Sequence, residues 1–271
     1  MGKIFSRRHP GIETEATPAQ EAPMSYTPKQ LQEIVRCSKD PRYFIDTYLT
    51  IQTGAGGTVP FTMRSYQQTQ LRAFAQFSTF CLQPRQSGAT SIPLAYQLWE
   101  ALFTSNTQHG AAFVKHVQAV EGMRLLQYWL DNLPTWLKPS TRNRNQSNLE
   151  FDNSSRIFCG IIGPNFSRGR SWSTVFADCL SFAKPMDQED FWLASIPSVL
   201  PHGRMFITGV PNGPTNTFAH IWANITSMQH SNFAPMHVDP LSVYSQQELD
   251  NIRALIGDRN FKREYDCEFL P

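Results

Sequence analysis

The chain has 271 residues, of which 41% are hydrophobic and 17% are charged, and its formal net charge is +2. This apolar content is enough for a sizeable core and excludes a wholly disordered chain. The near-neutral balance excludes a basic field over the whole molecule, so any contact with nucleic acid would need local patches. The sequence has no run of 18 or more apolar residues, and we therefore expect no transmembrane helix and no membrane partner.

The N-terminal segment differs in composition from the rest of the chain. Residues 1–26 are rich in Pro, Glu, Ala and Thr without hydrophobic periodicity, so we expect a flexible arm there. A helix is predicted from Thr27, with Pro28 in its first turn, and another follows Asp40, which is a suitable N-cap. The glycine-rich segment 53–58 is expected to be a turn.

From residue 65 onward, short apolar segments alternate with segments of helical periodicity. Strands are predicted at 79–82, 110–114, 173–178 and 204–209, helices at 65–77, 90–103 and 119–130, and a hairpin at 149–151 and 156–159. This alternation predicts an α/β fold with a mainly parallel sheet flanked by helices, and a small helical and hairpin subregion. Such sheets carry their chemistry in loops at the carboxyl ends of the strands.

Several chemistry-bearing residue types give no metal or nucleophile motif. The five cysteines are dispersed without a CxxC pair, which indicates reduced, mostly buried thiols. We expect two charged groups in solvated loops: the acidic Asp187, Glu189 and Asp190, and the basic Arg142, Arg144, Arg168 and Arg170. The arginines could meet DNA phosphates or the γ-phosphate of a nucleotide.

The loop Pro84–Ser91 has the layout of a phosphate-binding loop. An apolar strand precedes it, Gly88 supplies a tight turn, and Thr90 and Ser91 open a helix. Backbone N–H groups at such a helix N-terminus bind phosphate, and a Thr hydroxyl there can ligate Mg²⁺. The usual lysine is replaced by Ala89, so an ordinary strand-to-helix turn remains the favoured interpretation of the local pattern.

Asp178 ends a buried apolar strand and is followed by Cys179. An acid at this place holds Mg²⁺ in nucleotide hydrolases, where a second carboxylate usually orients the attacking water. The alternative is that Asp178 caps the next turn. The apolar segment 204–209 leads into a Pro-Asn-Gly sequence at 211–213, and an ordinary strand followed by a turn explains it locally.

Taken in chain order, the motifs and predicted elements of this sequence resemble those of the ATPase domain of the tailed-phage terminase large subunit. The resemblance covers about Cys37 to Leu270. The matching segments are Asp40–Tyr48, Tyr66-Gln67, Arg85–Gly88, Asn132–Pro139, Leu149–Ile157, Arg168-Gly169, Pro211–Gly213 and Phe261–Phe269. The resemblance implies a P-loop NTPase-like sheet of the ASCE or RecA-like type, with residues 27–271 forming one ATPase domain. The family continues into a nuclease domain, and we expect that domain to be absent from this chain, either because it was removed or because the natural protein lacks it.

The resemblance further implies a site for ATP and Mg²⁺. Tyr66 and Gln67 would contact adenine, and Gln86, Ser87, Gly88, Ala89 and Thr90 would surround the phosphates. Thr90 and Asp178 would hold Mg²⁺, Arg85 would contact phosphate, and Arg168 would act in trans or as a switch.

The implied partners are double-stranded DNA, a portal protein and a small terminase subunit, with a homo-oligomeric ring or an active paralog as further partners. The implied location is the host cytoplasm, with transient binding at the procapsid portal.

The sequence departs from the family where the chemistry occurs. The lysine position is Ala89, the catalytic glutamate position is Cys179, and the coupling strand is reduced to Thr208-Gly209-Val210. Loss of one electrostatic stabiliser commonly costs about 10²–10³ in rate. We therefore expect a DNA-packaging ATPase domain with weak or lost hydrolysis. The alternatives are a catalytically silent subunit that binds portal, capsid or an active paralog, and a helicase-like ATPase with the same core.

Overall fold

The computed structural model describes residues 26–54, 56–200, 202–227 and 232–271. The arm predicted for residues 1–26 lies, apart from Tyr26, outside the described residues.

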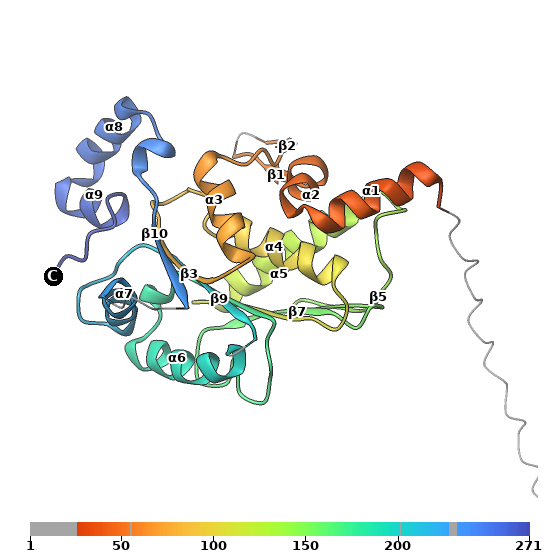
Figure 1. The fold of residues 1–271 in the computed structure, drawn as a ribbon. Helices are drawn as coiled ribbons and strands as arrows, with labels where there is room; N and C mark the ends of the chain where they lie inside the picture. Colours follow the sequence, from red (N-terminus) through yellow and green to blue (C-terminus); the bar gives the residue numbers. More distant parts are fainter. Residues whose placement is uncertain (1–25, 55, 201, 228–231) are drawn as a thin grey trace, which may run out of the picture.

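An eight-stranded sheet forms the centre of the molecule (Figure 1), in the order β10-β3-β9-β8-β4-β7-β6-β5. Its strands are β3 (Ser78–Leu82), β4 (Gln108–Phe113), β5 (Thr141–Arg144), β6 (Asn148–Phe151), β7 (Arg156–Ile161), β8 (Thr174–Asp178), β9 (Arg204–Gly209) and β10 (Phe233–His237). The strands from β10 to β7 pair in parallel, whereas β6 and β5 add antiparallel. The predicted α/β class with a mainly parallel sheet is therefore confirmed.

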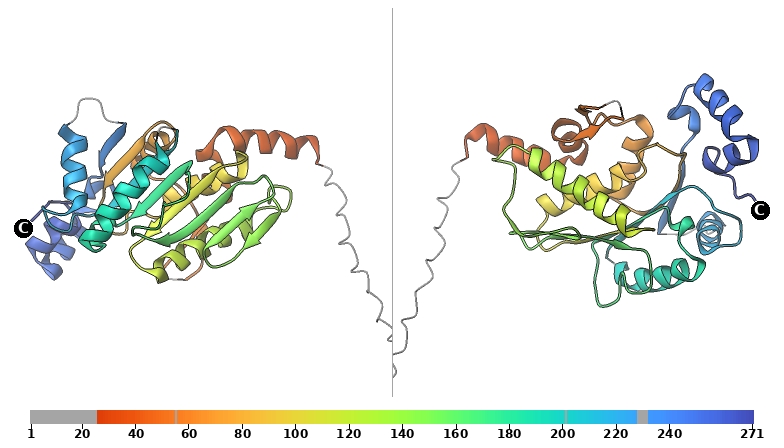
Figure 2. Two further views of the ribbon diagram at one scale, coloured as in Figure 1. Left: turned by 90° about the horizontal axis from the view of Figure 1, so that it is seen from below. Right: turned by 180° about the vertical axis from the view of Figure 1, so that it is seen from behind.

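Helices cover both faces of the sheet (Figure 1). On one face lie α3 (Ser65–Phe74), α4 (Ser91–Phe103) and α5 (His116–Asn132), and on the other lie α6 (Pro185–Val199) and α7 (Thr217–Ser227). On the same side of the sheet as α3, α4 and α5 lie α1 (Pro28–Lys39), α2 (Pro41–Tyr48) and a small two-stranded sheet of β1 (Thr50–Gln52) and β2 (Thr58–Pro60). At the end of the molecule away from α1, α8 (Gln246–Ile256) and α9 (Asp258–Glu264) lie beside the sheet (Figures 1 and 2).

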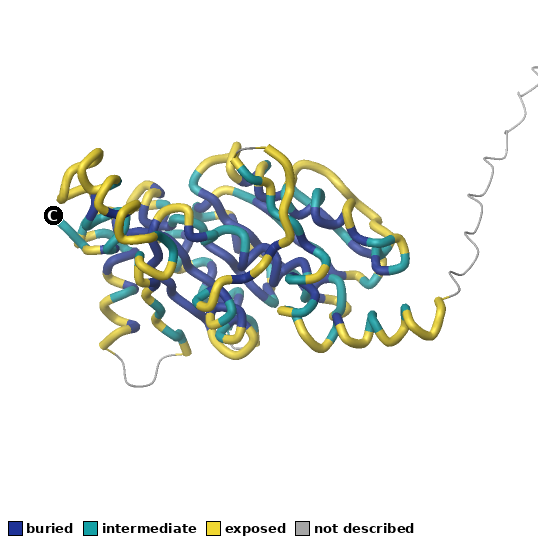
Figure 3. Tube along the Cα trace, turned by 90° about the horizontal axis from the view of Figure 1, so that it is seen from above, coloured by how far each residue is buried: buried dark blue, intermediate teal, exposed yellow. Residues whose placement is uncertain are grey.

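The apolar segments form strands because they are covered on both faces. All five residues of β3 are buried, as are four of the five in β8. Figure 3 shows the buried residues along the strands and the exposed ones on α1 and on the C-terminal helices. Fully buried strands read as continuous apolar segments, which is why sequence patterns located them well.

Two predicted helix starts are confirmed in detail. The hydroxyl of Thr27 accepts a hydrogen bond from the N–H of Gln30 at 3.3 Å, and Oδ1 of Asp40 accepts from the N–H of Tyr43 at 3.0 Å. Each bond satisfies one of the N–H groups that a helix N-terminus leaves without a partner.

Three predictions about elements are wrong. The helix predicted at 65–77 ends at Phe74. The acidic group Asp187, Glu189 and Asp190 lies on α6, because Phe191, Ser195 and Val199 give that segment a buried face. Arg142 and Arg144 lie on β5, a fully exposed edge strand whose polar sequence gives no apolar alternation.

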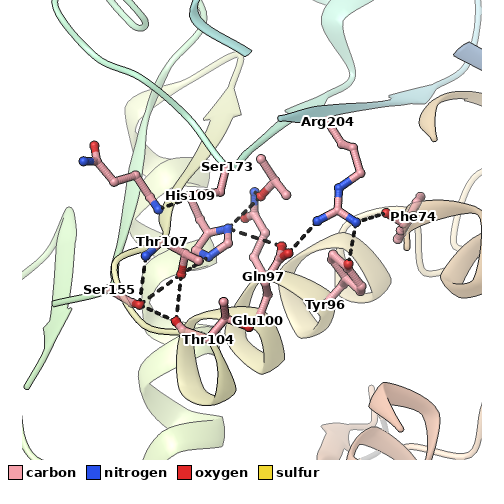
Figure 4. Close-up of polar contacts among 12 residues, drawn as sticks. Phe74, Tyr96, Gln97, Glu100, Thr104, Thr107, His109, Ser155, Ser173 and Arg204 are labelled. Atoms are coloured by element: carbon pink, nitrogen blue, oxygen red, sulfur yellow. Dashed lines mark hydrogen bonds and ion pairs between the residues drawn. The ribbon is translucent and has the colours of Figure 1, made fainter. Parts of the chain in front are cut away.

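A buried polar network stabilises the amino-terminal edge of β4, β8 and β9 (Figure 4). His109 is 0% exposed, and its ring nitrogens bond the hydroxyls of Thr174 and Thr107 at 2.8 and 2.9 Å. Next to it, Arg204 forms an ion pair with Glu100. Burial lowers the pKa of His109 to about 3, so the ring is neutral in the folded chain.

We expect His109 to make stability depend on acidification. The unfolded chain binds a proton at His109 below about pH 6.5, whereas the folded chain does not, so stability falls as pH decreases from there. Between about pH 7 and about pH 5 the loss from this residue is about 2 kcal/mol. Urea unfolding at both pH values should show a smaller loss in His109→Gln than in the wild type. The exposed-site variant His116→Gln is the control, and an unchanged loss in His109→Gln would contradict the assignment.

Candidate functional site

Three loops meet at the carboxyl ends of β3, β8 and β9 and form a cleft of about 310 Å³. Its lining is Gln83, Pro84, Arg85, Gln86, Gly88, Ala89, Thr90, Ser91, Gln118, Asp178, Cys179, Gly209 and Val210. The volume is within the range of small-molecule sites, and the carboxyl edge of a parallel sheet is where such sites occur. The sheet therefore brings together the three loops that the sequence pattern identified.

The loop between β3 and α4 presents backbone N–H groups. Positive φ angles at Gln86 (57°) and Gly88 (80°) bend the chain so that α4 begins at Ser91. The N–H groups of residues 86–90 donate no hydrogen bond to any described residue, whereas those of Ser91 and Ile92 bond the carbonyl of Gly88. Unpaired N–H groups at a helix N-terminus, with the positive end of the helix dipole, favour an anion.

A hydrogen bond joins the loop to the acid on β8. The hydroxyl of Thr90 donates to Oδ2 of Asp178 at 2.8 Å. Burial raises the pKa of Asp178, and this hydrogen bond partly opposes the shift. The Thr90–Asp178 pair is the one that the sequence predicted around Mg²⁺, and the structure places the two side chains in direct contact.

Several buried oxygens at the cleft have no partner. Oγ of Ser87, Oδ1 of Asp178 and Oγ1 of Thr208 are buried and have no partner within hydrogen-bond geometry among the described residues. Thr208 and Cys179 nevertheless lie close enough to the Asp178 carboxyl to lower its pKa against the effect of burial. Thr208 is the register partner of Asp178 across β8 and β9. Buried polar atoms are normally paired, so unpaired ones beside a cleft indicate that a ligand or an ion completes the site.

The residues present fit a magnesium ion. Mg²⁺ needs only one or two protein carboxylates, because waters and substrate phosphates fill its other positions. Asp178 supplies the carboxylate and Thr90 the hydroxyl. Among the described residues there is no cluster of three or more His, Cys, Asp or Glu, so a cage built of protein ligands alone is not found in that part of the chain.

Four residues outside the cleft lining hold the loop in shape. The Tyr66 hydroxyl and the Gln67 amide donate to the carbonyl of Ser87 at 2.7 and 3.2 Å. The Tyr244 hydroxyl donates to the carbonyl of Arg85 at 2.6 Å, and the Arg85 N–H donates to the carbonyl of Glu264 at 3.2 Å. Segments from α3, from the chain before α8 and from α9 thus fix the same short loop.

The charges of the cleft are few. Arg85 is the one cation among its lining residues, and it is exposed at the rim. Ala89 supplies no charge, and burial raises the pKa of the Cys179 thiol well above its ordinary value. Cys179 has left-handed backbone angles and lies against Gly209, where an added Cβ would be 3.1 Å from the Cys179 Cα.

Four predicted site residues are not part of the cleft lining. Ser87 lies in the loop between the lining residues Gln86 and Gly88, and its side chain is buried. Tyr66 and Gln67 face the Ser87 carbonyl, as described above. Arg168 lies on the loop between β7 and β8, where it is exposed and its Nε donates to the carbonyl of Pro164 at 2.9 Å.

Sequence reasoning missed other residues at the site. Gln83 and Gln118 line the cleft, and Tyr244 and Glu264 support the loop. Gln83 could have been noticed as the residue after an apolar strand. The other three reach the loop from distant parts of the chain, and no local pattern marks them.

Comparison with known proteins now gives the class of fold. No family model matches the sequence. The structure is similar to the large terminase ATPase domain of Thermus phage P74-26, with a TM-score of 0.62 and 18% identity over 78% of this chain and 95% of that one. It is also similar to the large terminase of bacteriophage HK97, with a TM-score of 0.67 and 11% identity over 85% of this chain.

A third similar structure is the large terminase of a thermophilic bacteriophage in complex with ADP, with a TM-score of 0.60 and 12% identity over 77% of this chain. The chain spans about half of this protein and of the HK97 protein, 54% of each. It therefore has the P-loop NTPase-like fold of phage large-terminase ATPase domains. One strand, β9, separates the loop strand β3 from the acid strand β8.

In the described part of the chain, no helix combines the length and the apolar character needed to cross a membrane.

The close packing of Gly88 predicts a site-specific cost for a side chain there. A Cβ added at Gly88 would lie 2.7 Å from Nε2 of Gln67, whereas one added at Gly213 would meet nothing within 4 Å. Both glycines have positive φ, so Ala costs about 1–2 kcal/mol at either position. Gly88→Ala should cost about 1 kcal/mol more, because the Gln67 amide must leave the Ser87 carbonyl. Thermal unfolding of both variants measures this difference, and equal losses would contradict it.

Proposed function

We propose that the chain is a terminase-like ATPase-domain protein of viral DNA packaging, which binds ATP with Mg²⁺ and hydrolyses it weakly or not at all. The observation that supports this most strongly is the cleft beside Ser87 and Asp178, where free N–H groups and unpaired buried oxygens converge. The fold shared with phage large terminases supports the same role. The large terminase of the thermophilic bacteriophage has been solved with ADP and with ATP-γ-S.

In this proposal, each part of the cleft has one task. The N–H groups of residues 86–90 and the Ser87 hydroxyl bind the phosphates, and Arg85 reaches them from the rim. Thr90 and Asp178 hold the metal. A bound Mg²⁺ would neutralise charge on the phosphate oxygens.

The same residues explain why hydrolysis would be slow. Phosphoryl transfer needs cations on the developing charge and a group that orients the attacking water. Ala89 provides no cation. Cys179 carries a thiol that burial keeps protonated, so it is a poor substitute for a carboxylate.

Arg168 supports an oligomeric version of the proposal. It is exposed and does not line the cleft of its own chain. We propose that it acts in trans at the cleft of a neighbouring copy, within a homo-oligomeric ring.

The proposed partners of that ring are double-stranded DNA, a portal protein and a small terminase subunit. The proposed location is the host cytoplasm.

A second candidate is a catalytically silent subunit that binds portal, capsid or an active paralog. The changes at Ala89 and Cys179 favour it, and α1 also presents Leu31 and Val35, each 50% exposed, as an apolar stripe. This candidate needs no nucleotide.

Calorimetric titration with a non-hydrolysable ATP analogue separates the two candidates. We expect saturable, Mg²⁺-dependent binding, and we expect Asp178→Asn to weaken it by at least about tenfold, because the metal loses its carboxylate. Asp250→Asn on α8, an exposed position, is the matched control. Binding that requires Mg²⁺ would count against the silent subunit. Absence of binding, or binding unaffected by Asp178→Asn, would remove the proposed site.

A further inference from the structure

The base-reading capacity of the cleft can be judged from the hydrogen bonds already made by Gln67. Its Oε1 accepts the N–H of Arg64 at 2.9 Å, and its Nε2 donates to the carbonyl of Ser87 at 3.2 Å. The side chain is only 6% exposed, and Nε2 packs directly against Gly88. Gln67 would have to break its contacts with the loop to reach the edge of a base.

Tyr66 is engaged in the same way. Its hydroxyl donates to the Ser87 carbonyl at 2.7 Å, and burial raises its pKa, so it remains a neutral donor. Only the aromatic ring of Tyr66 is left to contact a ligand. Stacking on an aromatic ring does not select among bases, because every base presents a π-face.

The cleft itself offers little that could discriminate. Its buried polar groups lie at the carboxyl edge of the sheet, on Ser87, Asp178 and Gln83. Gln83 is 2% exposed, its Oε1 accepts from the Gln70 amide at 2.8 Å, and its Nε2 has no partner among the described residues. The Gln83 N–H donates to the carbonyl of Gly209 at 3.2 Å, and Gly209 follows the register partner of Asp178, so this donor lies at the same sheet edge as the acid.

Apart from Gln83, the longer polar side chains of the lining are those of Arg85, Gln86 and Gln118, which are exposed. Water competes for exposed groups, whereas strong selection requires buried groups that the wrong ligand leaves unpaired.

We infer that the cleft recognises the Mg²⁺-bound polyphosphate without selecting the base, and that Gln67 and Tyr66 are positioning residues of the phosphate loop. This inference rests on the proposed function, because it assumes that the cleft binds a nucleotide. It names the ligand class more narrowly: any nucleoside triphosphate, with inorganic tripolyphosphate as the minimal ligand.

The test is a panel of titrations on the full chain with Mg²⁺ and ATP, GTP, CTP, UTP or inorganic tripolyphosphate. The four nucleotides should bind with Kd values within about tenfold of one another, because Gln67 and Tyr66 are engaged by the loop and the buried groups of the lining lie at the sheet edge beside Asp178. A preference for ATP of more than about tenfold would overturn the inference while leaving the proposed function intact. If no ligand of the panel binds, tripolyphosphate included, the proposed function fails and the inference fails with it.

A variant distinguishes loop positioning from base reading. Gln67→Ala should weaken the binding of ATP and the binding of tripolyphosphate by the same factor, because the loop loses its support at Ser87. Gln68→Ala, whose amide donates to the Met63 carbonyl at 3.1 Å on the same helix, is the control and should change neither. A loss confined to ATP would identify Gln67 as a base reader and overturn the inference. If Gln67→Ala does not fold, the wild-type panel still decides.

Discussion

The hydrogen bond from Thr90 to Asp178 joins two strands that are not neighbours in the sheet. The loop after β3 and the acid at the end of β8 are separated by β9, yet the two side chains meet at 2.8 Å. At the end of the intervening strand, Gly209 passes close to the backbone of Cys179, where an added Cβ would lie 3.1 Å from the Cys179 Cα. The whole candidate site depends on this arrangement, because it alone places a hydroxyl, a carboxylate and free N–H groups around one cleft.

The loop keeps its shape through contacts from the rest of the chain rather than through its own sequence. Carbonyls of Arg85 and Ser87 accept bonds from Tyr244, Tyr66 and Gln67, so the N–H groups on the other side of the peptide planes are left free. A cradle preformed in this way need not be ordered when an anion binds, which lowers the cost of binding. In the proposed function, these free N–H groups bind phosphate, whereas Ala89 and Cys179 supply neither a cation nor a carboxylate for hydrolysis.

The parallel sheet and the position of the cleft could be predicted from the sequence, because β3, β8 and β9 are buried on both faces and read as apolar segments. The pairing of Thr90 with Asp178 was implied by the family resemblance, and the structure places the two side chains in contact. The C-terminal helices α8 and α9 could not be predicted, since the residues they bury are only Leu249 and Phe261.

The adenine contacts implied for Tyr66 and Gln67 remain a prediction. The hydrogen bonds of these two residues to Ser87 join residues about 20 positions apart, which no local pattern reveals.

The central claim is that the cleft retains the means to bind a nucleotide and lacks two groups needed to hydrolyse it. The most direct measurement is steady-state phosphate release from ATP by the double variant Ala89→Lys, Cys179→Glu, compared with the wild type. The account predicts that turnover rises by at least about tenfold and is abolished by adding Asp178→Ala, because the restored lysine and glutamate act only with the metal in place. A double variant that binds ATP but turns over no faster than the wild type, or one whose turnover survives Asp178→Ala, would contradict it.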